Sequence, residues 1–66
     1  MSLGENIKIA RIRAKLSQGE MAKRAEISQN YLCLIEGDNQ VPSIAVLDKI
    51  ASACNTTSSE LMKESE

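Results

Sequence analysis

The chain has no histidine, tryptophan or phenylalanine, and Tyr31 is its one aromatic residue. Without histidine, an active site that uses imidazole as its general acid or base is excluded. Without a group of aromatic rings, a platform on which single-stranded bases stack is excluded as well. No paired carboxylates suggest a catalytic cleft, so we do not expect an enzyme.

Cysteine and long apolar runs are also scarce. Cys33 and Cys54 are the two cysteines, too few for a four-ligand zinc site and spaced like no metal motif, so we expect reduced thiols. No apolar run approaches the roughly 18 residues of a membrane helix, and no secretory leader is present. The sequence predicts a cytoplasmic protein with no metal, no cofactor and no membrane contact.

The length of 66 residues indicates a single domain, 1–66, whose last residues, 63–66, are expected to fray. Such a chain buries only about 60% of its unfolded surface, so a partner subunit would help its stability. We therefore expect no separate ligand-sensing domain. Control is therefore expected from the protein's own concentration or from a regulatory protein partner.

The net charge is −1, but the charges are unevenly distributed along the chain. Residues 8–24 contain six basic residues and one acidic residue, whereas residues 26–66 contain two basic and seven acidic residues. Any attraction to phosphate must therefore come from the first half. The alternative is that both halves are simply solvated surfaces.

Residues 16–37 predict two short helices joined by a tight turn. Ser17 and Glu20 form a capping-box pattern at the start of the first helix, and Ser28 can cap the second. Only Glu26 and Ile27 remain between the two helices, so the helices must cross sharply. This spacing is typical of a helix-turn-helix unit.

The rest of the chain predicts further helices and no strands. The apolar stripe of the first helix consists of Leu3, Ile7, Ala10 and Ala14, while Ile9 and Ile12 lie on its other side, either exposed or as a partner contact. A fourth helix after Ser43 is expected to turn Ile44, Leu47, Ile50, Ala51 and Cys54 inward. Thr57 and Glu60 form a second capping-box pattern, which begins a last helix of one or two turns that contains Leu61 and Met62. The other expected helices are 3–15, 18–25, 29–36 and 44–54.

In this pattern the sequence resembles the Cro/repressor-type helix-turn-helix regulators, the lambda repressor-like domains of phages and bacteria. The matching residues are Leu16, Ser17, Gln18, Glu20, Met21, Ala22, Ile27, Ser28, Tyr31, Leu32, Ile35, Glu36, Pro42, Ser43, Leu47, Ile50, Ala51, Thr57 and Leu61. The resemblance implies an all-α, five-helix bundle with the helix-turn-helix at its second and third helices. Glu26 replaces the usual turn glycine, and a left-handed backbone there would carry about 1 kcal/mol of strain.

The third helix carries the candidate DNA-reading residues. At 100° per residue, Gln29, Asn30, Cys33 and Leu34 face away from the apolar side. Glutamine and asparagine amides can pair with adenine N6 and N7, and Cys33 and Leu34 can contact a thymine methyl group. The alternative for Gln29 and Asn30 is that they are ordinary polar residues of a first helical turn.

The candidate phosphate contacts come from helix ends and from the resemblance. The amide ends that follow Ser17 and Ser43 are positive dipole ends suited to phosphate oxygens. The resemblance adds Gln18, which would also brace Gln29, and the three residues Tyr31, Asn39 and Gln40. Tyr31 can equally be a half-buried packing residue with a wet hydroxyl.

The resemblance also implies two structural features. Arg11 and Glu36 match an inward ion pair of the family. The dimer contacts lie near the last helix, where Asn55, Thr56, Thr57 and Leu61 are the candidates.

The leading hypothesis is a sequence-specific transcriptional regulator that binds double-stranded DNA. As a symmetric homodimer it would place residues 29–36 of each copy in the major groove, about 34 Å apart. The alternative is a protein-interaction module of the same fold, an antitoxin-like or anti-repressor partner with weak DNA affinity. The loop Asp38, Asn39 and Gln40, where the family often has basic residues, favours this alternative.

Overall fold

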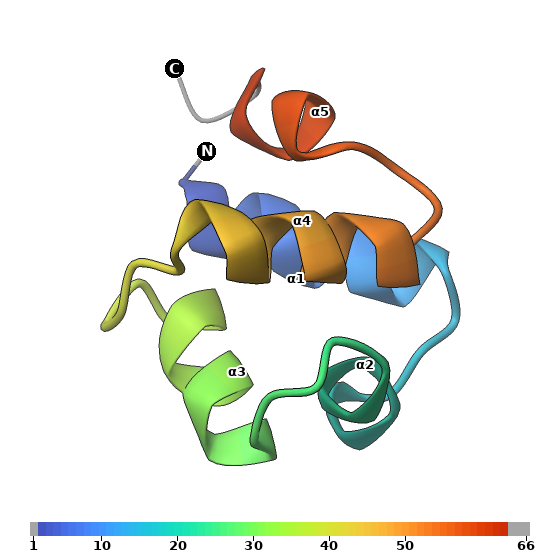
Figure 1. The fold of residues 1–66 in the computed structure, drawn as a ribbon, viewed down its shortest axis with the longest axis vertical. Coiled ribbons are helices and arrows are strands. Elements are labelled where there is room, and N and C mark those ends of the chain that lie inside the picture. The colour runs from blue at the N-terminus through green and yellow to red at the C-terminus, as the bar shows by residue number, and fades with distance from the viewer. Residues whose placement is uncertain (1, 64–66) are drawn as a thin grey trace.

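The computed structural model describes residues 2–63, which form five α-helices and no strand (Figure 1). In the view of Figure 1, α4 crosses the middle, α5 lies above it, and α2 and α3 lie below. The all-α class and the order of the helices agree with the sequence prediction, whereas the expected frayed end, 63–66, lies beyond the described residues except for Lys63. The helices are α1 (Leu3–Arg13), α2 (Gln18–Arg24), α3 (Gln29–Glu36), α4 (Ile44–Ala53) and α5 (Ser58–Lys63).

A serine begins each of the first four helices. The hydroxyl oxygens of Ser2, Ser17, Ser28 and Ser43 each accept a hydrogen bond from the backbone N–H three residues on. At α2 the capping box is complete, because the Glu20 carboxylate also accepts from the Ser17 N–H at 2.9 Å. The hydrogen bond from the Ser17 backbone N–H stabilises the charged carboxylate and so holds the pKa of Glu20 below its ordinary value. At α5 the Glu60 N–H donates to Thr57 Oγ1 at 3.2 Å. This is the bond from the backbone to the capping hydroxyl in the predicted capping box.

A residue with left-handed backbone geometry lies two positions after the last residue of each of the first four helices. Lys15, Glu26, Asp38 and Asn55 have φ between 58° and 61°. The backbone N–H of the next residue then donates to the carbonyl oxygen five residues back, as in a Schellman motif; Ile27 N donates to Ala22 O at 2.9 Å. Helices α1, α2 and α4 are therefore one or two residues shorter than predicted. The glycine expected to end α3, Gly37, keeps a negative φ of −88°, and Asp38 takes the left-handed position.

Replacing Glu26 with glycine should stabilise the protein by about 1 kcal/mol, because glycine adopts a left-handed backbone without the Cβ penalty. The substitution also removes the exposed Glu26–Lys49 ion pair, which at 3.2 Å on the surface contributes little. Glu26→Ala is the matched control, since it removes the same pair but keeps the strain. Thermal unfolding of both variants measures the difference, and equal stabilities would contradict the strain at this turn.

The helices pack around one apolar core. Helix α1 contacts α3 and α5, α4 contacts α2 and α5, and α2 contacts α3. Of the predicted stripes, that of α1 is buried or half-buried, but Ile44 is a correction: it is 68% exposed. Ile44 lies at one edge of the α4 stripe, and Val46 at the other edge packs against the core instead. The core is centred on the fully buried side chains of Ile7, Met21, Leu32, Ile35 and Ile50.

The apolar side chains outside this core differ in their exposure. Ile9 is half-buried, whereas Ile12 is 57% exposed. Met62, which was expected to pack beside Leu61 in the last helix, is 39% exposed. The last helix is therefore anchored by Leu61, whose carbonyl also accepts from the buried Asn6 amide at 2.8 Å.

Candidate nucleic-acid interface

Three of the four predicted DNA-reading side chains are exposed on one side of α3. Gln29, Asn30 and Cys33 are exposed, while Leu32 and Ile35 on the opposite side are buried. Leu34 is half-buried, so it presents less surface than the helical projection suggested. Helix α3 thus has a polar outer side that begins at its N-terminal turn.

This polar side borders a shallow hollow between α2 and α3, which we call the α2–α3 hollow. It is lined by Gln18, Gln29, Asn30 and Cys33. The Gln29 side chain lies close to the first turn of α2. Its Oε1 atom is 3.4 Å from the position that a Cβ atom at Gly19 would occupy. The hollow therefore gathers amide groups from two helices on one surface.

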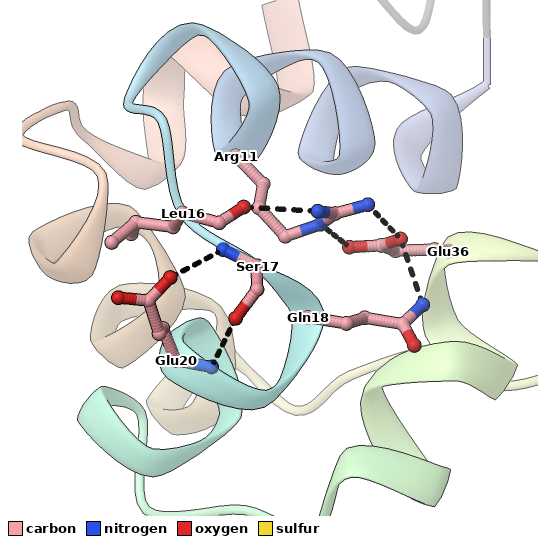
Figure 2. A network of polar contacts seen from close by, with 6 residues as sticks. All are labelled: Arg11, Leu16, Ser17, Gln18, Glu20 and Glu36. Atoms are coloured by element: carbon pink, nitrogen blue, oxygen red, sulfur yellow. Dashed lines mark hydrogen bonds and ion pairs between the residues drawn. The ribbon is translucent and has the colours of Figure 1, made fainter.

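Behind this surface, Arg11 of α1 and Glu36 of α3 form a doubly hydrogen-bonded ion pair (Figure 2). Arg11 Nε donates to Glu36 Oε2 at 2.7 Å, and Nη2 donates to Oε1 at 3.2 Å. Arg11 Nη1 also donates to the Leu16 carbonyl at 3.0 Å. The side chains of Arg11 and Glu36 are only 13% and 5% exposed. Little water reaches them, so each charge is stabilised mainly by its partner.

Gln18 connects the ion pair to the α2–α3 hollow. Its Nε2 donates to Glu36 Oε1 at 3.1 Å, as Figure 2 shows. The resemblance implied that Gln18 braces Gln29, but no hydrogen bond joins these two side chains in the part of the chain that the structure describes. The amide has a second N–H, which stays available to a ligand.

The loop after α3 has a structural role that the sequence did not reveal. Asp38 Oδ1 accepts a hydrogen bond from the Gly4 N–H, in the first turn of α1, at 3.1 Å. A carboxylate at this position satisfies a free amide and complements the positive end of the α1 dipole. The neighbouring residues Asn39 and Gln40 are exposed. No local pattern signals this contact, because Asp38 and Gly4 are 34 residues apart.

The other predicted site residues lie in varied surroundings. Ser17 and Ser43 are exposed caps, and Tyr31 is half-buried against the core. Among the dimer candidates, Asn55 and Thr57 are exposed and Thr56 is half-buried, but Leu61 is 4% exposed and has little surface left for a partner.

Among the residues that the structure describes there is neither a metal cluster nor a membrane-spanning helix. Within residues 2–63, no three side chains of the kinds that bind metals come together, and none of the helices has the length and apolar character to cross a bilayer. Cys33 is exposed, and burial raises the pKa of the Cys54 thiol, which packs against the core.

The match to a family model decides the classification of this chain. The model of the helix-turn-helix domain matches residues 2–63, nearly the whole length. The chain belongs to the helix-turn-helix domain family. Two known proteins place this member more closely. The chain is 36% identical over 64 residues to the immunity repressor protein of Bacillus phage phi105, covering 97% of this chain and 44% of the repressor.

A solved structure gives the second comparison. The helix-turn-helix chain superposes on a chain of the SinR protein/SinI protein complex with a TM-score of 0.89 and 32% identity. The match covers 94% of the helix-turn-helix chain and 61% of the matched chain of the complex. These comparisons confirm the resemblance to Cro/repressor-type regulators and the five-helix fold. The chain spans about half the length of the relatives that it matches.

Proposed function

We propose that this helix-turn-helix chain is a sequence-specific, DNA-binding transcriptional regulator. The observation that carries the proposal is the polar outer side of α3, where Gln29, Asn30 and Cys33 are exposed beside Gln18 of α2. In a helix-turn-helix unit the second helix enters the major groove, and its first residues contact base edges. Gln29 and Asn30 occupy these positions, with Cys33 and the half-buried Leu34 one turn further on.

The surrounding residues fix the position of the chain on the duplex. We assign phosphate contacts to Ser17, Gln18, Tyr31, Asn39, Gln40 and Ser43, none of which is fully buried. Such contacts set register without reading sequence. Because one short helix makes few base contacts, we also propose a symmetric homodimer that joins through the region of residues 55–57. We propose no enzymatic activity.

The alternative of a pure protein-interaction module loses part of its support. The acidic loop was its main argument, but the Asp38 carboxylate faces the first turn of α1 and accepts from Gly4 N–H. The loop charge is thus explained by the fold. A regulatory protein partner stays compatible with DNA binding, and the SinR protein of the structural comparison is seen in complex with the SinI protein.

Selection from a pool of random duplexes, followed by salt titration of the best sequence, tests the proposal. A specific binder with several phosphate contacts should lose affinity about tenfold or more for each doubling of salt. The selected sequences should contain two related half-sites. The absence of detectable duplex binding at about 50 mM salt would reject the regulator, since electrostatic attraction is then at its strongest.

Truncating Gln29 to alanine should relax the preference at one base position of each half-site by about 1 to 3 kcal/mol. The reason is that Gln29 is assigned to a base edge. Gln18→Ala is the comparison, because a lost phosphate contact weakens all sequences evenly. Binding of single-base operator variants measures both effects, and an even loss from Gln29→Ala would show that Gln29 does not read a base.

A further inference from the structure

A second hollow adjoins the α2–α3 hollow and contains a basic residue that the proposed function does not yet use. This α1–α3 hollow is lined by Lys8, Arg11, Gln18, Cys33, Glu36 and Gly37. Gln18 and Cys33 line both hollows. Lys8 therefore lies on the side of the molecule that is proposed to face DNA, although it belongs to α1 and not to the helix-turn-helix.

The two cations of the α1–α3 hollow are not equivalent. Arg11 is nearly buried, and its three nitrogen atoms donate to Glu36 and to the Leu16 carbonyl. Its charge is neutralised by a carboxylate that also accepts from Gln18. Lys8 is exposed, and among the described residues its ammonium forms no hydrogen bond or ion pair. The net positive charge of this hollow thus belongs to Lys8.

We propose that Lys8 binds a phosphate of the DNA backbone, at the edge of the major groove that α3 enters. The inference rests on the proposed function and extends it to α1. Lys8 shares its hollow with Gln18 at the start of α2 and with Gly37 at the end of α3. Gln18 is itself a proposed phosphate contact, and Gly37 begins the loop that carries Asn39 and Gln40, so Lys8 lines one hollow with residues of both regions.

The chemistry of lysine suits this role. An ammonium on a flexible four-carbon stem reaches a phosphate as a point charge and reads no base. The other exposed cations of residues 2–24 do not line either of the two hollows; they are Arg13, Lys15, Lys23 and Arg24. Lys8 is thus the exposed basic side chain that lines a hollow beside α3, since Arg11 of the same hollow is nearly buried in its ion pair.

Replacing Lys8 with glutamine tests the proposal, with salt dependence as the readout. Loss of one phosphate contact should lower the slope of log K against log salt by about 0.9. The advantage of the wild type over Lys8→Gln should therefore shrink about threefold between roughly 50 and 200 mM salt. The loss should be equal for operator and unrelated duplexes, and Lys8→Arg should restore the slope.

Lys63→Gln is the matched control, because it removes the same charge from α5, at the opposite end of the molecule from α2 and α3 (Figure 1). Its slope should equal that of the wild type, and the thermal midpoints of both variants should be unchanged. If the wild type binds DNA and Lys8→Gln keeps its affinity and slope, the Lys8 contact is refuted while the regulator stands. A loss confined to one operator base would also refute it. If the wild type binds no duplex at low salt, the proposed function itself fails.

Discussion

Replacing Arg11 with methionine should destabilise the protein by about 3 to 5 kcal/mol, because the Glu36 carboxylate is then buried without its cation. The Glu36 side chain is 5% exposed, so water cannot replace the two hydrogen bonds that Arg11 donates. A core of this size rarely supplies more than about 3 to 5 kcal/mol, so the variant should be largely unfolded at room temperature. Urea unfolding followed by circular dichroism measures the loss.

A double-mutant cycle separates the ion pair from general packing damage. Arg11→Met with Glu36→Met should be more stable than Arg11→Met alone, since a buried pair can often be replaced by apolar groups at little cost. Lys49→Met at the exposed Glu26–Lys49 pair is the control and should cost less than about 1 kcal/mol, because those side chains are 51% and 74% exposed. Additive losses from Arg11→Met and Glu36→Met would show that the two residues are not coupled.

Replacing Gly4 with alanine should also destabilise the protein strongly, by about 2 to 3 kcal/mol, as overpacking does in a rigid site. A Cβ at this position would lie 2.5 Å from the carbonyl oxygen of Ile35 and 2.8 Å from that of Glu36. These are backbone atoms at the end of α3, so relief requires the two helices to separate. The same Cβ would lie 2.6 Å from Asp38 Oδ1, in the hydrogen bond that joins the loop to α1.

The sign of this effect is diagnostic, because helix propensity alone favours alanine over glycine by about 1 kcal/mol. Gly19→Ala is the matched control within α2, where the added Cβ would meet Gln29 Oε1 at an ordinary 3.4 Å. It should be neutral or stabilising by up to about 1 kcal/mol. Chemical denaturation of both variants compares the two sites, and a stable Gly4→Ala protein would show that α1 and α3 do not approach so closely.

Much of the fold was predictable because its signals are local. Ser17, Ser28 and Ser43 cap their helices through amides three residues away, so the capping pattern located each start within the sequence itself. The helix ends were less predictable. Their left-handed residues are Lys15, Glu26, Asp38 and Asn55, none of them glycine, and of these the sequence singled out only Glu26.

The candidate site likewise contains residues whose exposure was predictable from the sequence and residues whose exposure was not. Helical periodicity placed Gln29, Asn30 and Cys33 on the exposed side of α3, because a 100° rotation per residue requires no knowledge of neighbouring helices. The half-burial of Leu34 depends on what packs beside α3, which periodicity does not contain. For the same reason Ile44 was expected inside the core and lies outside it.

The sequence by itself determined the five helices, their order and the polar side of α3, since caps and periodicity act within a few residues. Tertiary structure alone decided that Asp38 serves the first turn of α1, that Gln18 donates to Glu36, and that Lys8 lies beside the α3 surface. Each of these contacts joins residues at least 18 positions apart, between elements whose relative placement is set by burial of the shared core.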